Sequence, residues 1–164
     1  MKHIDLQQEL VNLGGGAHAL AIQILGNSDD AADAVHDAFA KVLARPDAFD
    51  ARKGPLKPWF LRVVRNQCLD LVRRRRAGES ASAELVDPAL QPDRRLEREQ
   101  RDEQLQQALA ELSADRRQIL VLRDYLDLSY AEIADVLQIA PGTVMSRLHR
   151  ARLALKEALN AYEE

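Results

Sequence analysis

The sequence predicts an all-α protein in which two small helical domains are joined by a flexible linker. Apolar residues make up 46% of the 164 positions but aromatic residues only 4%, so Leu, Val, Ile and Ala must build the cores. Apolar residues recur at helical spacing in both halves of the chain. Between the halves, the stretch 77–95 combines small and acidic residues with two prolines and lacks this period. We therefore expect domains at residues 1–78 and 101–164 and an acidic linker at 79–100.

The first domain is expected to begin with a helical stretch that is interrupted. Three consecutive glycines stand at positions 14–16, and each costs about 1 kcal/mol in a helix interior, so we expect a break there. The next helix is expected to have Ser28 as its N-cap, two aspartates in its first turn and a stop at Pro46. Its apolar face consists of Val35, Ala38, Phe39 and Val42.

A further helix is expected to extend from Pro58, which suits a first helical turn, to a run of four arginines. Cations at the C-terminal end of a helix are favourable because they meet the negative end of its dipole. The apolar side of this helix is formed by Phe60, Val63, Val64 and Leu71.

The second domain carries a helix-turn-helix pattern. Two helices are expected to precede the motif, with apolar positions Leu105, Ala108, Leu109 and Leu112 and, after a Ser113 cap, Ile119, Leu122 and Leu126. Ser129 and Glu132 form an S-x-x-E capping box, and residues 138–140 leave room for a tight turn. Pro141 suits the first position of the second motif helix, whose buried stripe is Val144, Leu148, Ala151 and Leu155.

Several classes of protein are excluded by the composition. Cys68 is the single cysteine, so no intramolecular disulfide is possible, and no Cys/His cluster has zinc spacing. The first ten residues lack the apolar core of a signal peptide, and no apolar run approaches membrane-spanning length. We therefore expect a cytoplasmic protein without membrane insertion, metal site, cofactor or catalytic residue.

The charges are unevenly distributed, although the net charge is −3. Residues 1–78 carry 12 Lys/Arg against 9 Asp/Glu, residues 79–100 carry 3 against 6, and residues 101–164 carry 8 against 11. The positive charge is concentrated in the arginine run 73–76 and in the stretch 147–156. Local clustering generates a surface potential, so an acidic total does not exclude a DNA-binding surface.

The second helix of the motif exposes a basic arc. At 100° per residue, Ser146, His149 and Arg150 lie opposite the buried stripe, while Met145, Arg147 and Arg152 lie at its edges. A DNA major groove admits one helix, and arginine can read guanine through two hydrogen bonds. The arc is therefore a candidate DNA-reading surface. From the helix pattern alone, a solvated charged face is an equally good interpretation.

The chain resembles bacterial RNA polymerase sigma factors of the extracytoplasmic-function (ECF) group in two places. Their region 2 is similar to NSDDAADAVHDAFAKVL followed by KPWFLRVVRNQCLDLVRRRR, and their region 4 to SYAEIADVL and GTVMSRLHRARLAL. The two motifs occur in the family order, with a short linker and no region 3 between them. The resemblance implies a promoter-specificity subunit that binds core RNA polymerase and directs initiation at a dedicated set of promoters in a stress or signal response.

The resemblance implies three sets of functional residues. In region 2, the first helix of the motif docks on the polymerase, which implicates Asp30, Asp33, His36, Asp37 and Lys41, whereas Phe39 is expected in the core. The loop and helix that follow capture and melt the proximal promoter element through Lys57, Trp59, Arg62, Arg65, Asn66, Arg73, Arg74, Arg75 and Arg76. Region 4 reads the distal element through Arg123, Thr143, Ser146, Arg147, His149, Arg150 and Arg152.

Some of these residues have a second interpretation or depart from the family pattern. A lone tryptophan on an apolar face usually packs, so Trp59 is a core anchor before it is a base-stacking residue. His36 stands where the family usually has Gln, and Ala32 where it often has Glu. Met145 replaces a residue that is often basic, and Gln138 replaces a common Gly in the turn.

Two other functions compete with this interpretation. A free-standing helix-turn-helix regulator would act without core polymerase, but residues 1–78 resemble no sensor or dimerisation domain. A metal-dependent nuclease would use the aspartates at positions 29–37, but acids on one helix without a second carboxylate cluster usually form a charged face. The expected partners are therefore core RNA polymerase and promoter DNA, double-stranded and melted, with an anti-sigma factor as a further possible partner.

Overall fold

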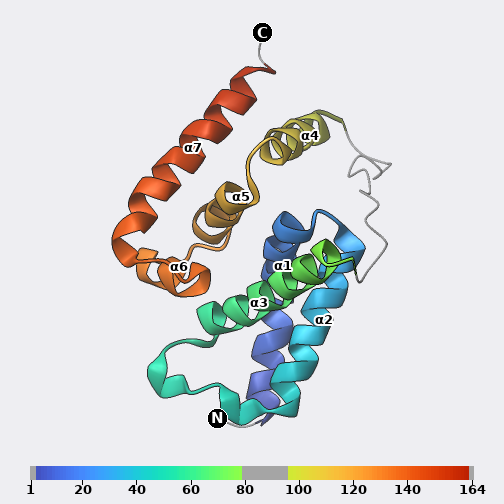
Figure 1. Cartoon of the computed structure of the whole chain (residues 1–164), viewed down its shortest axis with the longest axis vertical. Coiled ribbons are helices and arrows are strands. Elements are labelled where there is room, and N and C mark those ends of the chain that lie inside the picture. The colour runs from blue at the N-terminus through green and yellow to red at the C-terminus, as the bar shows by residue number, and fades with distance from the viewer. Residues whose placement is uncertain (1–2, 79–95, 163–164) are drawn as a thin grey trace.

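The computed structural model describes residues 3–78 and 96–162, with side chains for 5–78 and 102–162. Over these ranges the chain forms helices and turns and contains no β-strand, which confirms the predicted all-α class (Figure 1). Residues 79–95, where the linker is expected, lie outside the described ranges. Helix α4 begins at Leu96 and thus covers the last positions of the segment 79–100.

The first bundle consists of α1 (His3–Leu25), α2 (Ser28–Ala44) and α3 (Leu56–Arg76), each of which packs against the other two. Two short 3₁₀ turns, Pro46–Ala48 and Ala51–Lys53, connect α2 to α3. Phe60 lies at the centre of the bundle, fully buried, with its ring stacked on that of Phe39 at a centroid distance of 5.2 Å. The apolar faces predicted for α2 and α3 are therefore the faces that form the core.

The predicted break in the first helix is wrong, because α1 runs without interruption through Gly14, Gly15 and Gly16. The glycines permit close packing at two of these positions. A Cβ atom on Gly16 would lie 2.8 Å from Leu126 Cδ2, and one on Gly14 would lie 3.4 Å from the Phe39 ring. Tertiary packing thus outweighs the low helix propensity of the three residues.

The N-cap of α2 also differs from the prediction. Asn27, not Ser28, has the extended backbone of a cap, and its side-chain oxygen accepts a hydrogen bond of 3.0 Å from the amide of Asp30. Both residue types are good caps, and the predicted cap lies one residue too far along the chain. Ser28 instead begins the helix, and its hydroxyl lies 3.3 Å from the ring nitrogen Nε2 of His18.

The second bundle consists of α4 (Leu96–Ala110), α5 (Ala114–Leu120), α6 (Tyr130–Leu137) and α7 (Val144–Asn160). A π-helical turn, Val121–Tyr125, extends α5, and a 3₁₀ turn, Pro141–Thr143, leads into α7. Pro141 therefore begins this turn and not α7 itself. The caps at Ser113 and Ser129 form as predicted, and the Ser129–Glu132 capping box is complete.

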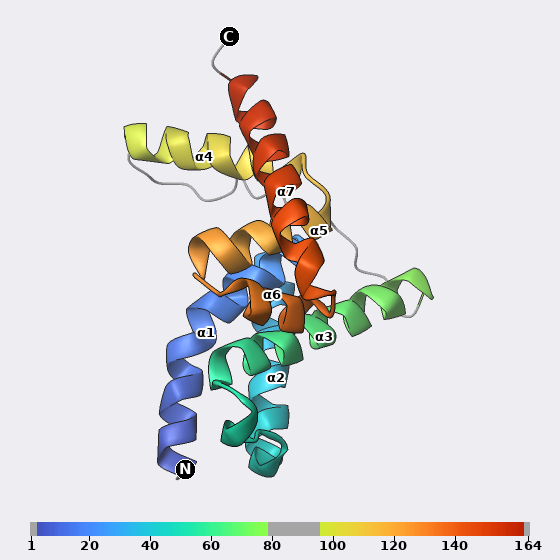
Figure 2. The same ribbon diagram turned by 90° about the vertical axis from the view of Figure 1, so that its left-hand side faces the viewer.

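The two bundles pack against each other along two pairs of helices. Helix α6 lies on α3, and α5 lies on α1, an arrangement that is visible from two directions (Figures 1 and 2). Buried residues of both bundles form one continuous apolar cluster, in which Leu126 of the second bundle packs against α1 at Gly16. In the described part of the chain, no helix combines the length and apolarity that a membrane crossing requires.

Replacing Phe60 with alanine should destabilise the protein by about 3–5 kcal/mol, because it removes a large side chain from a site that is fully buried. Urea unfolding followed by circular dichroism measures this change. Val11→Ala is the control, since Val11 is 69% exposed and its truncation should alter the free energy of unfolding by less than about 0.5 kcal/mol. Equal effects of the two substitutions would contradict the placement of Phe60.

The Cys68 thiol should react slowly with thiol reagents in the folded protein. Cys68 is fully buried, and burial raises its pKa to about 12, so the reactive thiolate is scarce at pH 8. Absorbance with a disulfide reagent should show complete reaction in urea and a much slower reaction in native buffer. Equal rates in the two conditions would exclude burial of this side chain.

Candidate polymerase and nucleic-acid interface

The outer face of α2 carries an exposed acidic cluster. Asp33, His36 and Asp37 are all exposed and lie on one side of the helix, at spacings of three and four residues. The two carboxylates and the imidazole are therefore available to a partner.

Two other residues of the predicted polymerase-binding set make contacts within the first bundle. The carboxylate of Asp30 forms an ion pair with Arg75 near the end of α3, and both side chains are largely buried, at 27% and 22% exposure. The ammonium group of Lys41 donates a hydrogen bond to the side-chain oxygen of Gln67. These two residues fasten α2 to α3.

The arginine run at the end of α3 likewise contains both exposed residues and one residue with an internal partner. Arg73, Arg74 and Arg76 are exposed, and Arg74 forms a 2.9 Å ion pair with Asp70 one turn earlier. Arg75 is turned inward to Asp30. Three guanidinium groups therefore form a cationic end to the helix, which suits phosphate contacts.

The N-terminal half of α3 presents three half-buried cations to the second bundle. Lys57 Nζ donates to the backbone carbonyl of Leu126 at 2.5 Å, and Arg65 Nε donates to the side-chain oxygen of Gln118 at 2.6 Å. Arg62 forms a 3.4 Å ion pair with Asp135. Burial lowers the pKa of Arg65. Asn66 is exposed.

Trp59 lies between the α2–α3 loop and the second bundle. Its ring contacts that of Phe49, with centroids 5.2 Å apart and planes tilted by 52°, and it is half-buried. Beside it is a cavity of about 480 Å³, lined by the loop, by α3 and by Ala131, Glu132 and Asp135 of α6. Trp59 thus packs on the loop and also lines this cavity.

The charged residues of the α2–α3 loop were not among those predicted from the sequence. Asp50 accepts hydrogen bonds from the backbone and side chain of Arg52, and the side-chain bond is the main reason that the Asp50 pKa is lowered. Lys53 and Gly54 follow and line the same cavity as Trp59. The signal was present as a charged turn before a Gly-Pro pair, which is typical of a structured loop.

The turn of the helix-turn-helix forms without the glycine that is common there. Gln138 ends α6 in the left-handed conformation, with φ = 58°, and its side-chain amide donates to the carbonyl of Asp135 at 2.7 Å. A non-glycine residue at positive φ is uncommon, and this hydrogen bond helps to hold it in place.

Helix α7 has the orientation that the apolar stripe predicts. Val144, Leu148 and Ala151 are buried, whereas the residues of the basic arc, Ser146, Arg147, His149 and Arg150, are exposed. Within the arc, Arg150 Nε donates to the carbonyl of Ser146 at 3.3 Å. The exposed Met145 lies beside them and adds an apolar contact surface.

Three residues of the predicted distal set also make contacts within the second bundle. Arg123 donates to the carbonyl of Leu128 at 2.8 Å, and its guanidinium lies 5.1 Å from the centre of the Tyr130 ring. Arg152 pairs with Asp124 at 3.1 Å, a contact that raises the Arg152 pKa. The Thr143 hydroxyl donates to the Ala140 carbonyl. All three therefore stabilise the motif.

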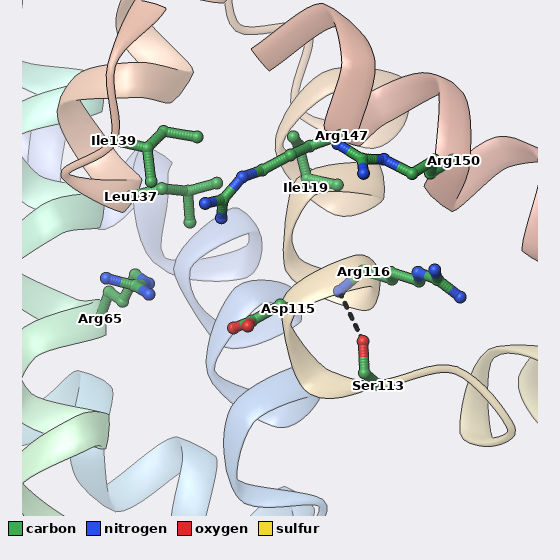
Figure 3. A pocket seen from close by; sticks show the side chains of 9 residues that line it. All are labelled: Arg65, Ser113, Asp115, Arg116, Ile119, Leu137, Ile139, Arg147 and Arg150. Atoms are coloured by element: carbon green, nitrogen blue, oxygen red, sulfur yellow. Dashed lines mark hydrogen bonds between the residues drawn. The ribbon is translucent and has the colours of Figure 1, made fainter. Parts of the chain in front are cut away.

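An arginine-rich cavity of about 510 Å³ lies between the bundles (Figure 3). Arg65 reaches it from α3, Arg116 from α5, and Arg147 and Arg150 from α7, while Asp115 points toward Arg65. Its polar lining is thus predominantly cationic, which favours anions. No group of three or more His, Cys, Asp or Glu side chains is arranged to hold a metal ion in the described residues.

A helix-turn-helix with an exposed basic arc, combined with a helical bundle that carries a cationic helix, is typical of a DNA-binding protein. Comparison with known families is consistent with this class. The profile described as "Sigma-70 region 2" matches residues 13–78, and that described as "Sigma-70, region 4" matches residues 102–155.

Individual relatives identify the group within that class. The ECF RNA polymerase sigma factor EcfG of Rhodopseudomonas palustris is 31% identical, with 94% of this chain and 85% of the relative covered. The factor SigW of Bacillus subtilis is 27% identical over 87% and 82% of the two chains. The structure of Bartonella quintana RpoE in complex with the anti-sigma factor NepR matches with a TM-score of 0.76 and 30% identity, covering 95% of this chain and 97% of that one.

The chain belongs to the ECF RNA polymerase sigma factors. These proteins are promoter-specificity subunits, which direct core RNA polymerase to initiate transcription at chosen promoters. Because both bundles match sigma regions, the comparisons favour this function over a free-standing regulator.

The Asp30–Arg75 contact leads to a prediction about stability. Asp30→Asn should lower the free energy of unfolding by about 1–2 kcal/mol, between the values typical of exposed and of buried ion pairs. The exposed Asp33→Asn should change it by less than about 0.5 kcal/mol. Chemical denaturation of both variants measures the difference, and equal stabilities would show that the ion pair is not a structural contact.

Proposed function

We propose that residues 1–78 bind core polymerase and the proximal promoter element, and that residues 101–164 read the distal element. The observation that carries this proposal is the pair of separate polar surfaces, one acidic on α2 and one basic on α7, each opposite a buried stripe. The protein acts without catalysis of its own, in the cytoplasm, and only in association with polymerase. Run-off transcription with core polymerase on a genomic promoter library tests this function, and no initiation above core polymerase alone would refute it.

Within the first bundle, Asp33, His36 and Asp37 form the polymerase-binding surface. Their exposure and shared face support this assignment, and their charge suits a basic partner helix. Asp30 and Lys41 support the surface indirectly, because their contacts with α3 fix the position of α2.

Helix α3 and the loop before it engage the proximal element. Arg73, Arg74 and Arg76 supply phosphate contacts that are independent of sequence, and the exposed Asn66 is suited to contact a base. Lys53 and Arg62 line the cavity beside Trp59, where they can neutralise the phosphates that flank an unstacked base.

Helix α7 reads the distal element through Ser146, His149 and Arg150, which are exposed opposite the buried stripe. Arg147 provides a phosphate contact at the edge of the arc. Three further residues position the helix through hydrogen bonds within the second bundle: Arg123, Thr143 and Arg152. The N–H groups of the two arginines that are not used in these bonds contribute phosphate contacts.

Regulation by an anti-sigma factor in a stress or signal response completes the proposal. Support comes from similarity to a sigma factor that was crystallised with its anti-sigma factor, over nearly the full length of both chains. The acidic face of α2 and the arginine-rich cavity are the surfaces that such a partner would cover.

Charge reversal of the α2 surface should weaken polymerase binding without unfolding the protein. We expect Asp33→Lys with Asp37→Lys to lose most of its binding to core polymerase in a pull-down, because exposed acids contribute little to stability. Asp5→Lys with Glu157→Lys is the matched control, since it changes the net charge equally at exposed positions elsewhere. Wild-type retention of the first double variant would refute the assigned surface.

Alanine substitutions in α7 should separate base reading from phosphate contact. His149→Ala and Arg150→Ala should each cost about 1–3 kcal/mol and relax the preference at one promoter position, whereas Arg147→Ala should weaken all sequences alike and lower the salt slope by about one. Polymerase-dependent transcription from a library of distal-element variants measures the preference. An unchanged preference in the His149/Arg150 double variant would show that this face does not read the bases.

A further inference from the structure

We propose that the arginine-rich cavity between the bundles binds a short chain of phosphates, supplied by a nucleotide or by inorganic polyphosphate. Its wall includes Arg147 and Arg150, which belong to the α7 surface proposed to contact the distal element. A bound phosphate chain and distal promoter DNA would therefore use the same two side chains, and the small anion would limit promoter recognition. This last step rests on the proposed role of α7, whereas the binding site itself does not.

The wall of the cavity carries an excess of positive charge. Among the described residues that line it, one is a carboxylate, Asp115, and four are guanidinium groups: Arg65, Arg116, Arg147 and Arg150. Because one negative charge cannot balance four positive ones, the cavity attracts anions. Guanidinium groups form two parallel hydrogen bonds with phosphate oxygens, so phosphate matches this wall better than a spherical anion does.

Arg65 is the half-buried member of this set. Its Nε donates to the side-chain oxygen of Gln118 at 2.6 Å, and Gln118 is itself only 2% exposed. Burial lowers the Arg65 pKa, and the negative charge of Asp115 opposes this shift. A half-buried cation with a neutral hydrogen-bond partner is stabilised by an anion nearby. A phosphate in the cavity would supply the negative charge that the amide of Gln118 lacks.

The arginines approach the cavity from three helices: Arg65 from α3, Arg116 from α5, and Arg147 and Arg150 from α7 (Figure 3). Arg147 extends from α7 toward the part of the cavity where Asp115 and Arg65 lie. Because the cations are distributed around the cavity, a single phosphate group would meet only some of them. A chain of phosphates presents oxygen atoms along its length and can therefore bind cations of several helices at once.

Apolar side chains form another part of the wall. Ile119 and Leu137 are buried, and Ile139 is partly buried. The cavity volume of about 510 Å³ lies within the range of about 300–1,000 Å³ that is usual for small-molecule sites. A nucleobase would gain contact with these apolar residues, whereas an inorganic chain would not. The two sources of phosphate therefore lead to different expected affinities.

Isothermal titration calorimetry of the full chain with inorganic tripolyphosphate, at fixed ionic strength and without divalent cations, tests the site. We expect saturable binding of one ligand per chain. Arg116→Gln should weaken this binding about three- to tenfold, between the effects typical of an exposed ion pair and of a charge-assisted hydrogen bond. Arg45→Gln is the matched control, since Arg45 is exposed and does not line the cavity.

Asp115→Asn provides a gain of affinity, which partial unfolding cannot mimic. It removes a like charge from the surroundings of the ligand and should tighten tripolyphosphate binding about threefold. Asp5→Asn makes the same change at an exposed position of α1 and should have no effect. Circular dichroism shows whether each variant retains its helices.

Two further ligands identify the source of the phosphates and control for charge. ATP carries the same number of phosphates as tripolyphosphate, so tighter binding of ATP assigns the site to a nucleotide, and equal or weaker binding assigns it to an inorganic chain. Tetraglutamate carries its negative charges on flexible side chains and should bind about tenfold more weakly than tripolyphosphate, because these side chains lose conformational freedom. Equal binding of tetraglutamate would overturn the assignment to phosphate.

Arg147→Gln tests whether the site shares residues with the distal-element surface. We expect it to weaken tripolyphosphate binding about three- to tenfold, as Arg116→Gln does. Wild-type affinity of this variant for tripolyphosphate would overturn the sharing. If tripolyphosphate binding weakens but polymerase-dependent transcription is unchanged, the proposed role of Arg147 in DNA binding fails and the phosphate site stands.

Two results would overturn the site itself. One is the absence of saturable binding of both tripolyphosphate and ATP to the unmodified chain. The other is an equal loss of affinity in Arg116→Gln and Arg45→Gln together with no gain in Asp115→Asn, which would show that the ligand responds only to the net charge of the protein.

Discussion

Leu126 is the residue on which the relative placement of the two bundles depends. Its side chain packs against α1 where Gly16 leaves room, and its backbone carbonyl accepts the hydrogen bond of Lys57 from α3. Leu126 directly follows the π-helical turn Val121–Tyr125. Its contacts with α1 and α3 therefore fix the position from which the chain continues toward α6. The capping box at Ser129 then starts α6 within three residues, and α6 lies on α3.

The orientation of α7 follows from that of α6 through a turn of fixed shape. Gln138 takes the left-handed conformation that ends α6, and the 3₁₀ turn that begins at Pro141 leads into α7. Burial of Val144 and Leu148 fixes the rotation of α7 about its axis, and this rotation alone decides which side chains face outward. The chemistry of the exposed arc is therefore determined by apolar residues that never touch a ligand.

Local patterns made much of this fold predictable from the sequence, and long-range contacts account for what was not. The Ser129 capping box and the stripe that begins at Val144 are periodic or short-range signals, and both formed as expected, except that Leu155 at the end of the stripe is only half-buried. The glycine run gave a wrong prediction, because the reason for Gly16 is a leucine more than a hundred positions away. The bond between Arg65 and Gln118 has no sequence signature, since each residue type is ordinary on an exposed helix face. Candidate site residues were identified by resemblance, but which of them have internal partners required the structure.

The continuous apolar core has a consequence for how the protein unfolds on heating. Residues such as Leu128 belong to a cluster shared by both bundles, so heat should unfold the described parts in one cooperative transition. Any change that tightens the junction between the bundles should therefore raise the melting temperature of both together. Selection for thermal resistance would then act first on the few side chains around Leu126 and Gly16, because a gain in stability there is shared by both bundles.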